Sequence, residues 1–518
     1  MSAVAAESFD AHLAIEDGPT RLTYAELFAE GRTFAAALVA SGVDPGDRVG
    51  LWAFNCAEWV IALLGISMAG SILVPINTRF KGREAADLLD RSGATALVTV
   101  TDFLDTDYVA MLRATEVPLP ELQTIIVARG DVPDGTEPWA TFRQRATDAS
   151  RAEVDQRWPQ LGPDDLSDIL FTSGTTGQPK GVLMTHGRTL CVATDWVAMT
   201  GLSDDDRYLM VNPYFHMFGL KAGILACLAS GATMLPEAVF DIDRILTRIG
   251  AEGVTVLPGP PTLYQSLLDH PDRSRFDLST LRVAVTGAAD IPVELIRRVD
   301  DELSFSTIIT GYGLTEAGTA VATTRGDDVE TIATTVGRPR PGFELRIMER
   351  GHEVATGEPG EVVLRGGSVM AGYLDDAEAT ANALTADGWL STGDIGIVDT
   401  SGNLKIVGRS KDMFIVGGFN TYPAEIENAL LRHPDIAQAA VIGIPDERLG
   451  EVGMAFVVTT SGATSIPDFT AWCREQMANY KVPRAVTVVD QLPINATGKV
   501  MKDVLRERAA QGRTEAAS

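Results

Sequence analysis

The residues best suited to chemistry form one dense run, Thr172–Gly181, with the sequence TSGTTGQPKG. Hydroxyl residues and glycines follow one another, so exposed backbone N–H groups and OH donors lie close together, and Lys180 adds a cation. Such a set suits a polyphosphate. The spacing differs from the GxxxxGK[ST] loop of common NTPases, because the glycines stand at 174, 177 and 181. A Gly/Thr-rich surface turn is the plain alternative.

A second motif, Gly311-Tyr312-Gly313-Leu314-Thr315-Glu316, follows the apolar run Ser306–Thr310, which we expect to be a strand. A ring, a hydroxyl and a carboxylate at a strand end can serve a purine, a phosphate and Mg²⁺. Magnesium usually takes one or two carboxylates together with phosphate oxygens. Taken alone, Glu316 is more simply a solvated loop charge.

Together these motifs resemble the signatures of the adenylate-forming superfamily, which includes acyl-CoA synthetases, peptide-synthetase adenylation domains and insect luciferases. The resemblance implies an enzyme that joins a carboxylic acid to AMP and then passes the acyl group to coenzyme A. It implies ATP, Mg²⁺ and coenzyme A, with Tyr312 on adenine, Thr315 at the α-phosphate, and Glu316 and Thr176 at the metal. The implied nucleotide site comprises Thr172, Ser173, Gly174, Thr175, Thr176, Lys180, Gly287, Ala288, Gly311, Tyr312, Gly313, Thr315, Asp394 and Arg409.

Two further segments extend that site. Thr286-Gly287-Ala288-Ala289 ends an apolar run, and its small residues let a flat ring approach the backbone, although close strand–helix packing would also need them. Asp394 and Arg409 are separated by a strand, a turn and a second strand. Because the second strand runs back along the first, we expect both side chains at the same edge of the sheet. An Asp can accept from both hydroxyls of a ribose, as the family's does, and a plain ion pair is the alternative.

Lys499, in the loop PINATGK, matches the lysine that in the family bridges the acid and the α-phosphate. When a carboxylate attacks phosphorus, two anions approach, and a fixed cation stabilises the transition state more than the ground state. Read without the resemblance, a lysine in a polar loop is simply solvated. The resemblance makes Lys499, Glu316, Thr176 and His216 the catalytic residues.

The thioester half-reaction depends on the C-terminal part of the chain. In the family, a small module rotates between the half-reactions about a residue two positions after the motif arginine, here Lys411. Gly417, Gly418 and Asn420 then face the CoA side, although a β-turn also explains the Gly-Gly. One departure is Ile415, where plant phenylpropanoid ligases carry a second lysine, so that lysine's contact with the adenylate is not expected here.

The acid pocket is expected around Asn212–Gly219 (NPYFHMFG), which resembles the family's aromatic/His motif. His216 either shields the carboxylate or is a hydrogen-bonded core residue. An apolar wall without a second charge favours a hydrophobic or neutral polar acid, and Lys221 is a candidate for a CoA phosphate. The expected wall consists of Met217, Phe218, Ala222, Val285 and Gly311.

A narrower resemblance concerns Phe215–Leu228 and Thr255–Pro271. These segments look like those of actinobacterial ligases that activate the indanedione propionate left from steroid rings C and D. The likeness runs over most of the chain and implies a bulky bicyclic acid with a propionate side chain.

The elements that must position these residues alternate between helix-like and strand-like patterns through the first ~400 residues, which predicts an α/β fold. Examples are helices over Tyr24–Ser41 and Ala85–Ser92 and strands over Arg48–Trp52 and Ala96–Val100. The segments Gly65–Pro75 and Ala226–Pro236 resemble each other, which suggests two similarly wound subdomains. The family fold adds a β-barrel-like part.

A domain boundary is expected at 409/410, giving an adenylation domain over 1–409 and a mobile α+β domain over 410–518. In the second domain we expect a helix from Pro423, strands over Ile436–Ile444, Gly453–Thr459 and Ala485–Val489, and a helix over Ile466–Asn479. The last ten residues have little to bury and are expected to be a frayed tail.

Composition narrows the class of protein. The formal net charge is −27, so nucleic acid and anionic membranes are disfavoured as partners. The four cysteines show no zinc spacing and the N-terminus no signal peptide, which indicates a cytoplasmic protein. The uncharged stretch Trp59–Thr78 reads better as a buried helix ending at Gly70 and a strand Ile72–Val74 than as a membrane span. A homodimer stays an open expectation.

Three rival activities remain. An acyl-AMP ligase that loads a carrier protein and a luciferase-like oxygenase would share the adenylation half-reaction. A non-catalytic nucleotide-binding protein would share only the binding site, and the presence of Glu316 and Lys499 argues against it.

Overall fold

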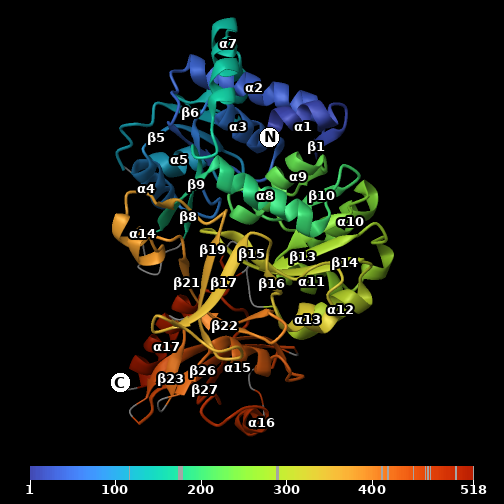
Figure 1. Ribbon diagram of the computed structural model, residues 1–518, viewed down its shortest axis with the longest axis vertical. Helices are drawn as coiled ribbons and strands as arrows, with labels where there is room; N and C mark the ends of the chain where they lie inside the picture. Colours follow the sequence, from blue (N-terminus) through green and yellow to red (C-terminus); the bar gives the residue numbers. More distant parts are fainter. Residues whose placement is uncertain are drawn as a thin grey trace.

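The structure is a computed structural model of the 518-residue chain. It describes all residues except 116, 173–178, 288–290, 410–411, 417–418, 447, 461, 464–465, 467, 496–498 and 517–518, and only the backbone of 419–420 and 512–516. The described residues form four sheets, of nine, eight, five and five strands. Figure 1 shows the two large sheets in the upper part of the molecule and the C-terminal elements at its lower end.

The eight-stranded sheet carries the predicted phosphate loop. Its strands lie in the order β20 (Gly372–Tyr373), β9 (Lys180–Thr185), β8 (Leu166–Thr172), β4 (Ile72–Pro75), β3 (Arg48–Trp52), β5 (Ala94–Val100), β6 (Thr124–Arg129) and β7 (Glu137–Pro138). The inner strands β4, β3 and β5 are parallel and largely buried, as apolar runs covered on both faces must be. Helix α2 (Tyr24–Ala40) begins at a capping box of Thr23 and Glu26.

The nine-stranded sheet carries the second motif. Its order is β16 (Arg338–Pro339), β15 (Gly318–Ala322), β14 (Thr307–Leu314), β13 (Val283–Gly287), β12 (Val256–Gly259), β10 (Arg207–Met210), β11 (Thr233–Pro236), β1 (Leu13–Asp17) and β2 (Thr20–Thr23). From β14 to β11 the strands are parallel, so their carboxyl ends meet at one edge. The α/β prediction is therefore confirmed for both large sheets.

The part expected to be barrel-like is an antiparallel sheet. Its order is β18 (His352–Glu353), β17 (Phe343–Glu349), β19 (Gly360–Gly366), β21 (Leu390–Val398) and β22 (Leu404–Arg409). Among the described residues the edge strands β18 and β22 do not pair with each other, so the sheet is not a closed barrel. In Figure 1 it lies between the large sheets and the C-terminal elements.

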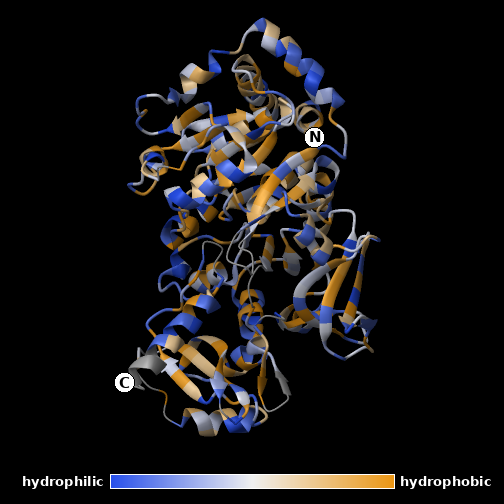
Figure 2. Cartoon of the chain, turned by 90° about the vertical axis from the view of Figure 1, so that its left-hand side faces the viewer, coloured by the Kyte–Doolittle hydropathy of each residue, from blue (hydrophilic) through white to orange (hydrophobic). Residues whose placement is uncertain are grey.

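The C-terminal elements form a sheet of their own, in which β25 (Ile436–Asp446) and β26 (Gly450–Thr459) make a long antiparallel pair. Around them lie β23 (Phe414–Val416), β24 (Phe419–Thr421), β27 (Ala485–Val488), α15 (Pro423–Leu430) and α16 (Phe469–Gln476). The predicted helix over 466–479 is shorter than expected at both ends. Figure 2 shows hydrophobic colouring along much of this sheet.

The expectation of a frayed tail is wrong. Helix α17 (Lys502–Ala516) continues to residue 516. Leu505 and Ala509, four residues apart and thus on one helix face, are buried against the cluster that includes Ile442 and Phe456. Ion pairs from Lys502 to Glu427 at 2.8 Å and from Arg506 to Asp412 at 2.6 Å help these two apolar side chains to dock the helix.

The apolar stretch 59–78 is divided between helix α3 (Ala57–Met68) and strand β4, with Gly70 in a left-handed conformation between them. Both elements are buried in the core. None of the helices in the described part of the chain has the length and hydropathy needed to cross a bilayer.

Candidate functional site

The phosphate loop connects two antiparallel strands. Strands β8 and β9 pair up to the register Thr172↔Lys180, and Thr172 Oγ1 lies 3.5 Å from the Lys180 carbonyl oxygen. A Walker loop opens a helix, whereas this one opens a strand, as predicted. Ser173, Gly174, Thr175 and Thr176 lie outside the described residues.

Tyr373 joins the phosphate-loop strand to the second motif. Lys180 Nζ lies 5.0 Å from the centre of the Tyr373 ring, within the range of a cation–π contact. The Tyr373 hydroxyl donates to Glu316 Oε1 at 2.9 Å. Burial, and secondly the neighbouring Glu316, raise the pKa of Tyr373, so the hydroxyl stays protonated as a donor. Two motifs 136 residues apart (316 − 180) are thereby brought together.

A second cluster joins Tyr312, Asp394 and Arg409. The Tyr312 hydroxyl donates to Asp394 Oδ2 at 2.6 Å, and Arg409 Nε lies 3.1 Å from Asp394 Oδ1. Strands β21 and β22 place Asp394 directly opposite Arg409, the geometry that their spacing predicts. Burial raises the pKa of Tyr312, and the Asp394 carboxylate raises it further. The carboxylate is 9% exposed, so its orientation is fixed by these two partners.

Glycines line the ends of the central strands of the nine-stranded sheet. Gly287 pairs with Gly311 across β13 and β14. A Cβ on Gly287 would lie 2.6 Å from the Gly311 carbonyl oxygen, so close strand packing by itself requires glycine there. Thr286 is buried, and its hydroxyl has no hydrogen-bond partner among the described residues, which leaves a donor for a ligand. Gly313 lies near the end of β14, Thr315 follows it, and Ala288 is outside the described residues.

His216 is held as a neutral imidazole. Its Nδ1 accepts from the Phe218 backbone N–H at 3.2 Å, so the neutral ring carries its proton on Nε2. Removal from water lowers the pKa of His216 to about 4. This bond agrees with the interpretation of His216 as a hydrogen-bonded core residue, and its role beside the carboxylate of the acid stays a prediction.

The expected acid wall is well packed. Met217, Ala222 and Val285 are almost fully buried, and the Phe218 ring meets Trp196 edge-on at 5.2 Å. Phe218 and Ala222 belong to η2 (Phe218–Leu225), a π-helical segment, a conformation found often at functional sites.

The suggestion that Lys221 meets a CoA phosphate is wrong. Its side chain is 0% exposed, and Nζ lies 2.9 Å from Asp168 Oδ1. A cation enclosed in this way is out of reach of a phosphate in solvent.

Lys499 lies in a loop closed by reciprocal bonds, with the Lys499 N–H donating to Asn495 Oδ1 and the Asn495 N–H donating to the Lys499 carbonyl. These contacts are local to the C-terminal part. Lys411, Gly417 and Gly418 lie outside the described residues, as does the side chain of Asn420. The two clusters of residues predicted for the nucleotide site thus come together within residues 172–409.

Sequence reasoning missed Tyr373 and Arg91. Arg91 Nη1 donates to the Pro179 carbonyl at 2.8 Å and its guanidinium lies over the Phe171 ring, so it supports both ends of the phosphate loop. Arg91 belongs to α4 (Gly82–Ser92) and Tyr373 to a two-residue strand. Neither has a motif around it, and only their tertiary contacts reveal them.

Metal ligands are sparse. Among the described residues, no group of three or more His, Cys, Asp or Glu side chains could hold a metal ion. The carboxylate held closest to this cluster is that of Glu316, through its hydrogen bond with Tyr373. A hard cation here would take most of its oxygens from elsewhere.

Comparisons with known proteins extend over nearly the whole chain. The family model described as AMP-binding enzyme matches residues 3–374, and the model described as AMP-binding enzyme C-terminal domain matches 425–499. A relative from Mycobacterium tuberculosis is 51% identical over 96% of each chain, and one from Rhodococcus jostii is 49% identical over 97% of each. Both are named 3-[(3aS,4S,7aS)-7a-methyl-1,5-dioxo-octahydro-1H-inden-4-yl]propanoyl:CoA ligase.

Solved structures agree in fold. The anthranilate CoA ligase AuaEII in complex with anthranoyl-AMP has a TM-score of 0.91 at 28% identity, covering 99% of this chain and 98% of that one. ATP-bound MatB from Rhodopseudomonas palustris has a TM-score of 0.86 at 30% identity and covers 98% of each chain.

Proposed function

The chain belongs to the family of AMP-binding enzymes and is an acyl-CoA ligase, and we propose that it activates a bulky, hydrophobic propionate-bearing acid through the residues described above. The observation that carries the proposed site is the Tyr373–Glu316 hydrogen bond. It draws the phosphate-loop strand and the second motif to one place, where β- and γ-phosphates and a metal would meet.

On the nucleotide side, Tyr312 lies beside adenine and Asp394 accepts from the ribose hydroxyls. Asp394 suits this role because Tyr312 and Arg409 hold its carboxylate before any ligand arrives. The loop 172–180 surrounds the phosphates, with Lys180 held at its end by Tyr373. The Thr286 hydroxyl, which has no hydrogen-bond partner among the described residues, offers one more donor at this strand edge.

On the acid side, the carboxylate lies beside His216. A neutral ring with its proton on Nε2 can donate to a carboxylate oxygen without trapping it in an ion pair, so the carboxylate keeps its nucleophilicity. The charge that grows at the α-phosphate is met by Lys499, brought in by the C-terminal domain. No general base is required, since the acid is already ionised.

The described residues offer only part of the oxygen ligands that a Mg²⁺ ion needs. With Glu316 as one carboxylate, the remaining oxygens would come from the nucleotide, water and the Thr176 hydroxyl, a set that Mg²⁺ accepts. When bound, the metal would offset the charge of the leaving pyrophosphate. Tyr373 would orient the carboxylate that holds it.

The acid we propose is a fused bicyclic ketone with a propionate arm. Two relatives with about half of their residues identical are named for that chemistry. The wall residues Met217, Phe218, Ala222 and Val285 offer no charge, in keeping with neutral rings.

For the second half-reaction we propose that the domain beginning at 410 rotates about Lys411 and turns Gly417–Asn420 towards the CoA side. The support is the family's C-terminal domain match at 425–499. An acyl-AMP ligase or an oxygenase would stop before thioester formation.

The test is a panel of acids scored by pyrophosphate release with and without CoA. The panel contains the 1,5-dioxo bicyclic propionate, an aromatic propionate, and straight-chain acids of six to twelve carbons. We expect the bicyclic acid to show the highest kcat/KM and CoA to yield its thioester. A straight-chain acid at least tenfold better would refute the proposed acid, and adenylate that persists with CoA would refute the thiol step.

A further inference from the structure

One buried ion pair lies outside the roles assigned so far. Lys221 Nζ and Asp168 Oδ1 are 2.9 Å apart, with the two side chains 0% and 3% exposed. Within the described part of the chain, neither atom has a hydrogen bond to any other group. Burying two charges is costly, and such a pair is often no more stable than apolar residues of the same size. Stability alone therefore does not account for it.

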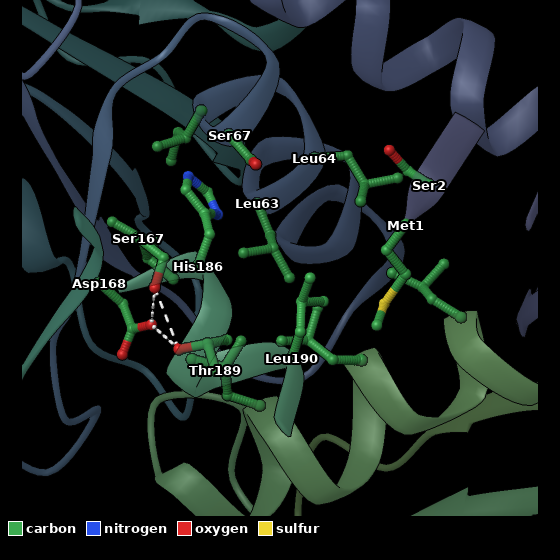
Figure 3. Close-up of a pocket in the computed structure, with 15 residues that line it drawn as sticks. Met1, Ser2, Leu63, Leu64, Ser67, Ser167, Asp168, His186, Thr189 and Leu190 are labelled. Atoms are coloured by element: carbon green, nitrogen blue, oxygen red, sulfur yellow. Dashed lines mark hydrogen bonds between the residues drawn. The ribbon is translucent and has the colours of Figure 1, made fainter. Parts of the chain in front are cut away.

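The other oxygen of Asp168 is also fully engaged. Oδ2 accepts from Ser167 Oγ at 2.6 Å and from Thr189 Oγ1 at 2.8 Å, as Figure 3 shows. Thr189 belongs to helix α8 (His186–Thr200), which follows the phosphate-loop hairpin. Asp168 is thus fixed from two sides and provides a rigid anchor for the lysine.

The pair connects the two halves of the site. Asp168 is on β8, four residues before Thr172, where the phosphate loop begins. Lys221 is on η2, five residues after His216 and next to Ala222 of the acid wall. The pair thus links the strand that leads into the phosphate loop directly to the helix that lines the acid pocket.

Packing behind η2 is incomplete. A cavity of about 120 Å³ lies beside it, lined by Leu220 and Leu225 of η2. Leu63, Leu64 and Leu190 of the facing helices line its other side (Figure 3). Ser167, Asp168, His186 and Thr189 contribute polar groups to its lining, as Figure 3 shows. A π-helical segment next to a void has room to shift, so its position depends on specific ties.

From these observations we propose that Asp168 and Lys221 are positioning residues, which fix η2 relative to β8 and so set the acid carboxylate in line with the α-phosphate. Neither touches a substrate. A displacement of about 1 Å between reacting groups can slow a reaction about 100-fold, although each substrate still binds. This inference rests on the proposed acid and nucleotide sites.

The test variant is Asp168→Asn with Lys221→Met. It removes both charges, keeps side-chain size, and leaves Ser167 and Thr189 an acceptor, so no unpaired charge is buried. We expect kcat for acid-dependent pyrophosphate release to fall at least tenfold. KM for ATP and for the bicyclic acid should each stay within threefold, and thioester formation from supplied acyl-adenylate within twofold.

The control is Glu237→Gln with Arg248→Met, which removes another buried ion pair, 2.7 Å apart with side chains 1% and 11% exposed. Their further ion-pair partners, Arg244 and Glu252, lie on the same helix as Arg248. The pair ties the end of β11 to α10 (Ile242–Glu252), and its removal should leave all four kinetic quantities within twofold. A second version, Asp168→Asn with Lys221→Leu, which keeps the acceptor for Ser167 and Thr189, carries the same expectation if the first fails to fold.

Three results would overturn the inference: unchanged kcat, equal losses in both half-reactions, or a loss confined to either KM. Equal losses would mean that the pair is merely structural. Failure of the unaltered enzyme to release pyrophosphate with any acid would instead refute the proposed function on which the inference rests.

Discussion

Replacing Asp394 by alanine tests the nucleotide half of the site most directly. If the carboxylate accepts from both ribose hydroxyls, the variant loses two charge-assisted hydrogen bonds worth about 1.5 kcal/mol each. The sum of about 3 kcal/mol corresponds to a rise of about 100-fold in KM for ATP. The Arg409 guanidinium, 41% exposed, is left to solvent at little cost.

Stability should fall as well. The Tyr312 hydroxyl donates to Asp394 at 2.6 Å, and without an acceptor this buried donor costs about 1–3 kcal/mol of the free energy of unfolding. In Asp394→Asn the amide oxygen again accepts a hydrogen bond from the Tyr312 hydroxyl, but the side chain carries no negative charge to strengthen its hydrogen bonds with the ribose. This variant should therefore recover most of the lost stability while KM for ATP stays raised about tenfold or more.

The assay is pyrophosphate release against ATP concentration at saturating acid, with thermal unfolding measured in parallel. The control is Glu344→Ala, which removes a carboxylate paired with Arg365 across the neighbouring strands β17 and β19 at 2.7 Å. That pair is exposed, so both KM and stability should hardly change. A folded Asp394→Ala enzyme with KM for ATP within threefold of the original would refute the ribose contact.

Three further outcomes are expected. Lys499→Ala should slow adenylation about 100-fold or more yet convert supplied acyl-adenylate to thioester within threefold of normal; equal losses would exclude the assigned role. Since burial lowers the pKa of His216 to about 4, the unfolded chain binds the proton first, and stability should fall by up to about 3 kcal/mol as pH drops from about 6.5 to 4. His216→Gln should flatten the pH profile of thermal unfolding between pH of about 4 and about 6.5, and an unchanged profile would contradict the assigned role of His216 in this pH dependence. Gly287→Ala places a Cβ 2.6 Å from the Gly311 carbonyl oxygen. We expect the free energy of unfolding, measured by chemical denaturation, to fall by about 1–3 kcal/mol. An unchanged free energy would mean that strands β13 and β14 move apart to accept the methyl group.

Much of the arrangement could be predicted from the sequence where chemistry and local pattern coincide. The strand before the phosphate loop, the strand after it, and the opposition of Asp394 and Arg409 all follow from hydrophobic runs and turn residues. Parallel strands end at a common edge, so the meeting of Gly287 and Gly311 follows as well.

The contacts and elements that could not be predicted from the sequence depend on tertiary packing. Tyr373 reaches Glu316 over 57 residues, and Lys221 reaches Asp168 over 53, through packing that no local pattern records. The C-terminal helix was missed because only Leu505 and Ala509 of its apolar residues anchor it, too few to give a clear period. The barrel was expected from family likeness, whereas pairing among the described strands leaves the sheet open.

The void behind η2 also bears on how the enzyme responds to hydrostatic pressure. Its 120 Å³ amounts to about 70 mL per mole of protein, within the range of volume changes that accompany unfolding. Water entering this space on unfolding reduces the volume of the system, so pressure favours the loosened state. Compression is thus expected to act first on the contacts between η2 and the helices that line this cavity with it.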